Sequence, residues 1–167
     1  IEASADLTTT IPAIVFGAVG TAGQRCTTLR RAIIHQSIYT KVVEQLVHAY
    51  EQLKIGDPLN SENHLGPLIN QRAIEQYRLA IESAEQAGAK ILYGGSVLED
   101  GGFFVQPTII EATAELPIVQ QETFAPILYV HGYEILEEAI SINNQVDYGL
   151  SSAIFTKDLL QAEQFLS

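Results

Sequence analysis

The stretch GTAGQRCTT, residues 20–28, lies between two apolar segments and carries the one cysteine of the chain. The segment before it, Ile11–Val19, belongs to a predicted helix, and the segment after it, Leu29–Ile34, is typical of a β-strand. Glycine and other small residues allow a tight turn and a close approach of the backbone to a ligand. The order helix, small-residue turn, strand therefore predicts an α/β unit with Cys26 at the tip of its turn.

Cys26 has two interpretations. A lone cysteine in a globular chain is most often a small buried hydrophobe. Here, however, Cys26 lies outside the apolar runs, Arg25 precedes it, and two threonines follow it. A neighbouring cation favours the thiolate, which is the nucleophilic form of cysteine. The surroundings therefore favour a reactive thiol, without specifying the reaction.

The composition excludes several classes of partner. The chain has 167 residues, enough for one compact domain with a sizeable core. Its 9 basic and 20 acidic residues give a net charge of −11, which argues against nucleic acid and against anionic membrane surfaces as partners. The longest apolar run, Ile11–Val19, contains a proline and is too short to cross a bilayer. We therefore expect no nucleic acid and no membrane among the partners.

The cysteine and histidine content gives further expectations. A single cysteine excludes an internal disulfide and a multi-cysteine metal site, and it fits a reducing, cytoplasmic location. No secretory signal is visible. No metal site is expected, because the histidines lack ligand spacing and are interpreted as structural or surface residues: His35, His48, His64 and His131. Because the chain has no methionine and starts at Ile1, we expect a piece of a larger protein or a processed one.

Hydrophobic periodicity and turn residues predict alternating helices and strands. The predicted helices cover Thr8–Ala18, the residues from Ser37 to about Leu53, those from Asn70 to about Gly88, a segment around Ile135–Ile140, and the residues after Asp158. The predicted strands are Leu29–His35, Lys90–Tyr93, Phe103–Ile110, Ile127–Val130 and Leu150–Phe155. Pro107 places the third of these strands at an edge or bend. Alternation of this kind predicts one α/β domain with a mainly parallel sheet and helices on both faces.

Predicted helix caps follow from the short polar residues before each helical segment. Asp6, Ser37 and Asn70 are expected to cap the first three helices, and Asp158 with Gln161 resembles a capping box.

The glycines at positions 17, 20 and 23 do not have dinucleotide-binding spacing, and no strand precedes them. They are therefore interpreted as the turn that carries Cys26 and not as a phosphate cradle.

Several motifs resemble the aldehyde dehydrogenase superfamily. GQRCTT (residues 23–28) resembles its nucleophile segment, and QETFAP (121–126) resembles its Glu-x-Phe-x-Pro signature. Further matching segments occur in the expected order: KIGDP (54–58), LGPL (65–68), GAK (88–90), GG (94–95), FVQPT (104–108) and YGLSS (148–152). The resemblance covers nearly the whole chain. It implies that residues 1–167 form most of the catalytic domain of that fold, with the nucleotide-binding domain absent.

The resemblance also implies a chemistry. In that family a cysteine thiolate, here Cys26, attacks an aldehyde, the thiohemiacetal gives up hydride to NAD(P)+, and water hydrolyses the resulting thioester. The cofactor implied is NAD, with NADP as the alternative. Glu122 matches the glutamate that holds the nicotinamide ribose, and Phe124 matches the aromatic beside the nicotinamide. Without the motif, Glu122 is a solvated or capping carboxylate and Phe124 a core residue.

The residues beside Cys26 resemble the branch that acts on α-aminoadipic semialdehyde and its cyclic imine, piperideine-6-carboxylate, in lysine catabolism. In that branch the residue at Arg25 anchors the substrate carboxylate, as a guanidinium can do bidentately. The alternatives for Arg25 are a structural ion pair and an electrostatic effect on Cys26. Thr27 is expected to line the pocket or to pack. The alkoxide formed on attack needs donors, and the family uses the cysteine N–H and an upstream asparagine, which this sequence lacks.

The family's general base, a glutamate in a Glu-Leu-Gly-Gly segment, is expected upstream of Ile1. The 167-residue chain alone is therefore expected not to turn over aldehyde. Two alternatives stay open: a cysteine-dependent thioester or acyl hydrolase with Glu122 as base, and an inactive scaffold in which Cys26 is buried. Family resemblance and unpaired strand edges also predict a homo-oligomer, either a dimer or a tetramer.

Overall fold

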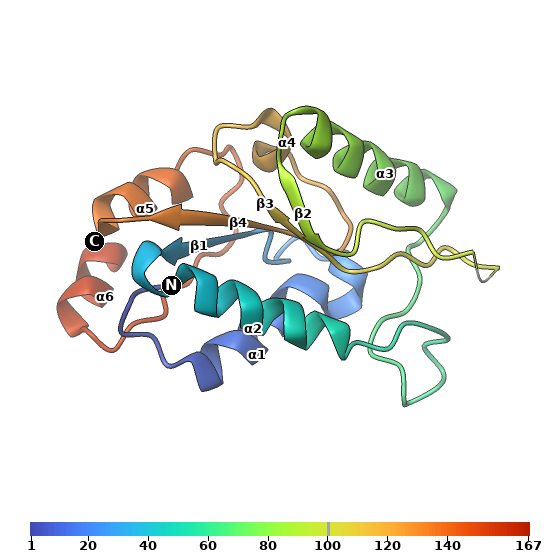
Figure 1. Cartoon of the computed structure of the whole chain (residues 1–167), viewed down its shortest axis with the longest axis horizontal. Helices are drawn as coiled ribbons and strands as arrows, with labels where there is room; N and C mark the ends of the chain where they lie inside the picture. Colours follow the sequence, from blue (N-terminus) through green and yellow to red (C-terminus); the bar gives the residue numbers. More distant parts are fainter. Residues whose placement is uncertain (100) are drawn as a thin grey trace.

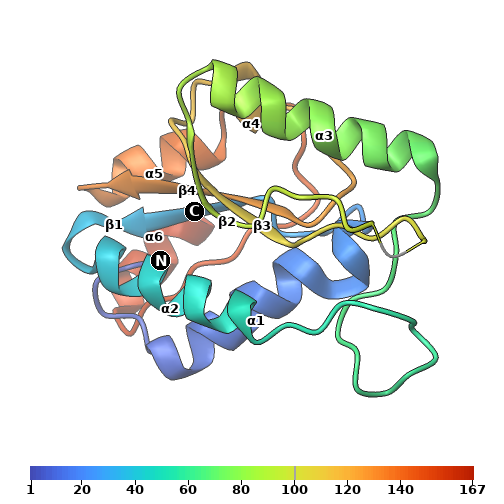
Figure 2. The same ribbon diagram turned by 45° about the vertical axis from the view of Figure 1, so that its right-hand side comes forward.

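The computed structural model describes residues 1–99 and 101–167, and its elements form three layers (Figures 1 and 2). The strands are β1 (Arg31–His35), β2 (Lys90–Tyr93), β3 (Thr108–Glu111) and β4 (Ile127–Tyr133). The helices are α1 (Leu7–Val19), α2 (Tyr39–Glu51), α3 (Gln71–Gln86), α4 (Pro117–Gln120), α5 (Leu136–Asn143) and α6 (Leu159–Leu166). Two short 3-10 turns, Gly20–Gly23 and Gln36–Ile38, flank β1.

The sheet has the strand order β1-β4-β3-β2. β1 runs parallel to β4, with Arg31 opposite Tyr129, and β4 runs parallel to β3, with Thr108 opposite Ile127. Only β2 is antiparallel to its neighbour β3. The prediction of a mainly parallel sheet is therefore confirmed.

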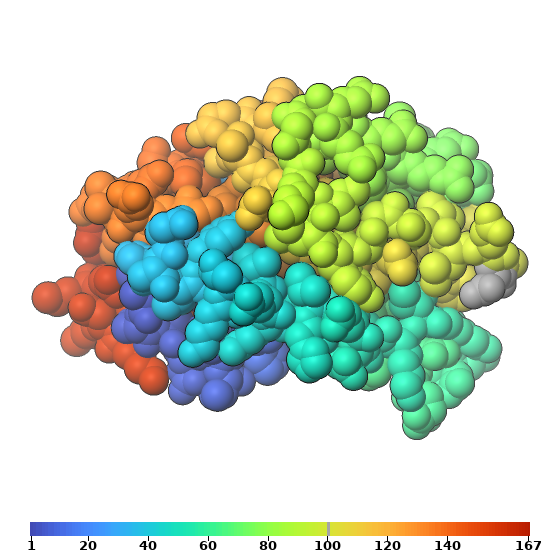
Figure 3. Space-filling model, viewed as in Figure 1, coloured from blue at the N-terminus to red at the C-terminus, as the bar shows by residue number. Residues whose placement is uncertain are grey.

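Helices cover both faces of the sheet, as predicted. On one face α1 and α2 pack with residues such as Ile14 and Leu46, and on the other face α3 and α4 pack with residues such as Tyr77 and Val119. The central strand β4 serves both cores because successive side chains point to opposite faces: Leu128 and Val130 join the first core, and Ile127 and Tyr129 join the second. In Figure 3, α2 and the segment around β2 cover the viewed side, and the connection between α2 and α3 projects from it.

Local caps explain where several helices begin. Asp6 accepts a hydrogen bond from the N–H of Thr8 at 3.0 Å, and Asn70 accepts one from the N–H of Ala73 at 3.0 Å, so both predicted caps are confirmed. Asp158 accepts from the N–H groups of Leu160 and Gln161. The second half of the expected capping box is missing, because the Asp158 N–H donates to the Thr156 hydroxyl at 3.0 Å and the Gln161 side-chain oxygen accepts from that hydroxyl at 2.6 Å.

Three predictions of local structure are wrong. Ser37 does not cap α2: it lies in the turn before that helix, and its N–H donates to Nδ1 of His35. The strand predicted at Phe103–Ile110 begins only at Thr108, because Pro107 has no N–H to give to a ladder. This strand also lies between two others and not at the edge of the sheet. The strand predicted at Leu150–Phe155 does not form: among the described residues this segment has no ladder partner, and it touches the N-terminus through one bond, from the Glu2 N–H to the Phe155 carbonyl. The surface loop predicted at Ser96–Gly102 includes residue 100, which lies outside the described residues.

Candidate active site

The turn before Cys26 has an unusual backbone. Thr21, Ala22 and Gly23 all have positive φ angles, of 52°, 53° and 71°. Left-handed conformations cost about 1–2 kcal/mol at residues with a Cβ, so surrounding contacts must stabilise this turn. One of these contacts is with the second motif: a Cβ on Gly23 would overlap the carbonyl of Ala125. The glycine therefore allows the backbones of the two motif segments to touch.

Cys26 lies at the tip of the turn that follows. The N–H of Arg25 donates to the hydroxyl of Thr28, and the N–H of Thr28 donates to the carbonyl of Arg25, both at 3.1 Å. These two bonds close the turn around Cys26. The cysteine is exposed, and among the described residues its N–H makes no hydrogen bond. Its thiol and its backbone donor are therefore both free to meet a ligand.

Glu122 and Phe124 lie between α4 and β4, on the segment that touches Gly23. The carboxylate of Glu122 is 3.9 Å from Nη2 of Arg30, and its side chain remains 30% exposed. Phe124 is 44% exposed, with the guanidinium of Arg30 5.1 Å from the centre of its ring. The core-packing interpretation of Phe124 is therefore wrong. The ring lies at the surface under a cation.

Arg30 is the residue that the sequence interpretation missed, because it was taken only as the polar start of a strand. Its guanidinium binds the carbonyls of Thr123, Arg25 and Gly23, and it pairs with Glu122. Burial lowers the pKa of Arg30, and the neighbouring Glu122 carboxylate raises it. One sequence signal could have drawn attention to this position: two adjacent arginines before an apolar strand, in a chain with only 9 basic residues.

Arg25 points elsewhere. Its guanidinium lies 5.6 Å from the centre of the Phe16 ring, and no carboxylate in the described residues lies within ion-pair distance of it. The structural ion pair considered for Arg25 is therefore not found in this part of the chain. A carboxylate anchor at Arg25 stays a prediction.

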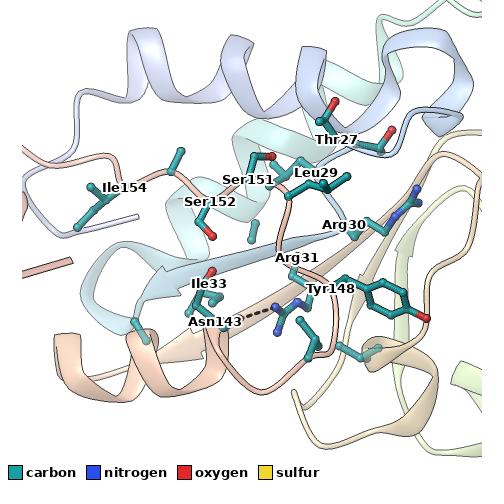
Figure 4. Close-up of a pocket in the computed structure, with 18 of the residues that line it drawn as sticks. Thr27, Leu29, Arg30, Arg31, Ile33, Asn143, Tyr148, Ser151, Ser152 and Ile154 are labelled. Carbon is teal, nitrogen blue, oxygen red and sulfur yellow. Dashed lines mark hydrogen bonds between the residues drawn. The ribbon is translucent and has the colours of Figure 1, made fainter. Parts of the chain in front are cut away.

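A cavity of about 600 Å³ is lined by Cys26, Thr27 and Glu122 together. The segment 146–155 lines the same cavity beside Leu29–Ile33 (Figure 4). Arg31 closes the space toward α5 by donating to the carbonyls of Ile142, at 2.8 Å, and Asn143, at 3.0 Å. Thr27 is among the residues that line the cavity. Arg25 and Phe124 are not among its lining residues.

The remaining titratable groups do not form a second centre in the part of the chain that the structure describes. No three histidine, cysteine or acidic residues come close enough there to hold a metal ion. No described helix is both long and apolar enough to cross a membrane. His131 is buried on β4, where Nδ1 donates to the Ala112 carbonyl at 2.6 Å and Nε2 has no partner. Among the described residues no histidine lines the cavity with Cys26, so a cysteine hydrolase would depend on a carboxylate of the lining, Glu122 or Asp147, as its base.

Comparison with known proteins assigns this arrangement to a family. Residues 1–167 match the family model described as the aldehyde dehydrogenase family. Aldehyde dehydrogenase family 7 member A1 of Pisum sativum is 51% identical over 153 residues, which cover 92% of this chain and 30% of the relative. Alpha-aminoadipic semialdehyde dehydrogenase of Mus musculus is 48% identical over 156 residues, which cover 93% of this chain and 29% of the relative.

Solved structures agree with these sequence matches. The NAD+ complex of an aldehyde dehydrogenase from Bacillus cereus superposes with a TM-score of 0.96 at 30% identity and covers 99% of this chain and 34% of its own. Lactaldehyde dehydrogenase from Escherichia coli superposes with a TM-score of 0.95 at 35% identity, over 98% of this chain and 35% of its own. Of the curated relatives named above, the chain spans about 30% of the length.

Proposed function

Because the chain belongs to the aldehyde dehydrogenase family, we propose that it supplies the nucleophile and part of the cofactor site of an NAD+-dependent aldehyde dehydrogenase. The observation that carries this proposal is that an exposed Cys26 and a partly exposed Glu122 line the same cavity. The two residues come from segments almost a hundred positions apart in the sequence. Residues 1–167 would form most of the catalytic domain.

Cys26 would begin the reaction. Its thiolate forms a bond to the aldehyde carbon, and the carbonyl oxygen becomes an alkoxide. The unpaired N–H of Cys26 can donate to that oxygen, as an oxyanion donor must. After oxidation of the thiohemiacetal, the acyl group remains on Cys26 as a thioester. Attack by water then releases a carboxylic acid and returns the thiolate.

The residues beside Cys26 fit a nicotinamide cofactor. A carboxylate accepts hydrogen bonds from ribose hydroxyls, and Glu122 has exposed surface on the cavity for this purpose. Phe124 offers an exposed aromatic ring on the same segment. The cofactor, when bound, accepts the hydride that leaves the thiohemiacetal carbon. NAD+ is proposed first, with NADP+ as the alternative.

The substrate class proposed is a semialdehyde that carries a carboxylate, as the name of the mouse relative indicates for that protein. Arg25 is the cation proposed to bind that carboxylate, because it directly precedes the nucleophile and has no carboxylate partner in the described part of the chain. Its guanidinium lies over the Phe16 ring and outside the cavity lining, so it would have to turn toward the substrate. Thr27 lines the cavity next to the thiol. A cytoplasmic homo-oligomer, dimer or tetramer, completes the proposal, and the β2 edge of the sheet leaves room for pairing between subunits.

The test is a chimera in which this chain replaces the corresponding segment of the pea relative. We expect reduction of NAD+ when α-aminoadipic semialdehyde is added, followed as absorbance at 340 nm. Changing Cys26→Ser should lower kcat at least about 10³-fold, because the nucleophile is lost. Changing Arg25→Gln should raise KM for the semialdehyde more than for an aldehyde without a carboxylate.

Two results would contradict the proposal. Oxidation that survives Cys26→Ser would remove the nucleophile from its role. Thioester hydrolysis without any nicotinamide, in a chimera that does not oxidise aldehydes, would favour the hydrolase alternative. The 167-residue chain by itself is expected to show no NAD+-dependent oxidation.

A further inference from the structure

Arg30 is anchored at both its backbone and its side chain. Its carbonyl accepts the N–H of Tyr129 at 2.9 Å, which fixes the residue to β4 just before β1 begins. Its side chain is only 16% exposed. A long cation that is mostly buried must find hydrogen-bond partners, because a buried charge without them is costly. The partners of Arg30 are therefore informative.

Those partners come from two distant segments. Nη1 donates to the carbonyl of Thr123, 93 positions away, and Nη2 donates to the carbonyl of Arg25 at 3.2 Å and contacts that of Gly23 at 3.5 Å. The first carbonyl belongs to the segment of Glu122 and Phe124. The other two belong to the turn that presents Cys26. One planar guanidinium therefore joins the Cys26 turn to the Glu122–Phe124 segment.

The carbonyl of Arg25 is a shared acceptor. It receives the N–H of Thr28, which closes the turn around Cys26, and it also receives Nη2 of Arg30. Movement of the guanidinium would therefore be transmitted to the turn that holds the thiol. On the other side, Nη2 of Arg30 forms an ion pair with Oε1 of Glu122 at 3.9 Å, and the Glu122 side chain stays 30% exposed.

From these contacts we propose that Arg30 is a positioning residue that holds the Cys26 turn and the Glu122–Phe124 segment in one fixed arrangement. The proposal rests on the proposed function, because it gives Arg30 the task of aligning nucleophile and cofactor carboxylate. Arginine is needed because its fork reaches acceptors in two directions, whereas the lysine ammonium is a point charge on a flexible stem. The neighbouring Arg31, which binds only the end of α5, does not join these two segments.

The test uses the 167-residue chain and two readouts that need neither aldehyde nor cofactor. Hydrogen exchange is measured at residues 24–28 and 122–125, and alkylation of Cys26, the one cysteine, is followed by intact mass with iodoacetamide at a fixed pH. For Arg30→Met we expect exchange to rise at least about tenfold in both segments together and alkylation to slow about fivefold. For Arg30→Lys we expect both segments to loosen as well, because the charge is kept and the fork is lost.

Arg31→Met is the matched control, since it removes two carbonyl bonds of the same kind. It should raise exchange near residues 142–143 and leave the two site segments unchanged. The proposal is overturned if only one segment loosens in Arg30→Met, if Arg30→Lys behaves as wild type in both readouts, or if Arg31→Met loosens the site segments equally. Should Arg30→Met fail to fold, Arg30→Lys alone decides. A chimera without dehydrogenase activity would count against the proposed function and leave these results intact.

Discussion

The two faces of the sheet differ in what their cores contain. The face covered by α1 and α2 buries one large hydrophobic cluster, and the hydroxyl of its largest buried residue, Tyr50, has no partner among the described residues. The face covered by α3 and α4 contains a hydrogen-bonded group in which the Tyr77 hydroxyl bonds to the Gln106 carbonyl at 3.0 Å and the Thr108 hydroxyl at 2.7 Å. The Thr108 hydroxyl also accepts the N–H of Gly95.

These polar contacts gather where the parallel strands begin. Thr108 is the first residue of β3, and its N–H donates to the Pro126 carbonyl, directly before β4. Gly23 packs against Ala125 at the same end of the sheet, and Arg30 lies directly before β1. The Cys26 turn and Glu122 therefore lie at the end where polar bonds fix the strands. The apolar face contributes mainly stability, and the polar face contributes placement.

The largest effect is expected at Gly23. Changing Gly23→Ala should reduce the free energy of unfolding by about 3 kcal/mol, because the new Cβ meets the Ala125 backbone and φ is +71°. The rate of Cys26 alkylation should change as well, because Gly23 precedes the turn that holds the thiol. Gly88→Ala is the matched control: its φ of +83° carries similar backbone strain, but nothing lies within 4 Å of the new Cβ. It should cost about 1 kcal/mol, measured by urea unfolding, and equal losses at the two sites would contradict the packing argument.

A smaller effect is expected from paired hydroxyl deletions. Tyr77→Phe should cost about 1–2 kcal/mol, because it removes a hydroxyl bonded to the Gln106 carbonyl and to the buried Thr108 hydroxyl. Tyr50→Phe should be neutral or slightly stabilising, because its hydroxyl is buried without a partner in the described chain. The measurement is the denaturant midpoint of both variants. A larger loss for Tyr50→Phe would reverse the distinction between the two faces.

The smallest effect concerns pH. Burial lowers the pKa of His131, Arg31 adds to the lowering, and the Ala112 carbonyl and Glu115 oppose it. The native chain therefore binds a proton less readily at this site than the unfolded chain does. Stability should fall as the pH decreases below about 6.5, the ordinary histidine value. Thermal unfolding from pH 7.5 to 5.5 should depend less on pH in His131→Gln than in the wild type.

The exposed His48 provides the control for that series, with His48→Gln expected to keep the wild-type slope. An unchanged slope in His131→Gln would show that the buried ring does not contribute to the pH dependence of stability.

Local patterns were enough to predict much of the fold. Asp6 and Asn70 are caps because a short acceptor precedes an amphipathic run, which is a property of neighbouring residues. The strands at β1, β2 and β4 follow from short apolar runs between turn residues. The prediction failed at Leu150–Phe155, where an apolar run alone does not supply a ladder partner. It also failed for the position of β3, because strand order depends on contacts between distant residues.

The candidate site likewise contains residues that the sequence predicted and one residue that it did not. Cys26 on a small-residue turn and Glu122 in a motif were named from the sequence, and both line the same cavity in the structure. Arg30 was missed because its partners are carbonyl oxygens, which every residue carries and no sequence pattern distinguishes. Phe124 was given a buried alternative, yet it lies exposed beneath the Arg30 guanidinium.

The sequence by itself determined the family, the α/β class, the caps at Asp6 and Asn70 and the residue types available for chemistry, because these follow from local patterns and from ordered motifs. Only the tertiary structure decided that the Cys26 turn packs against Ala125, that Arg30 reaches Thr123 across 93 positions, and that Arg25 lies over Phe16. The physical reason is that backbone packing and hydrogen bonds to carbonyls depend on the path of the chain in space, and residue identity alone does not specify that path.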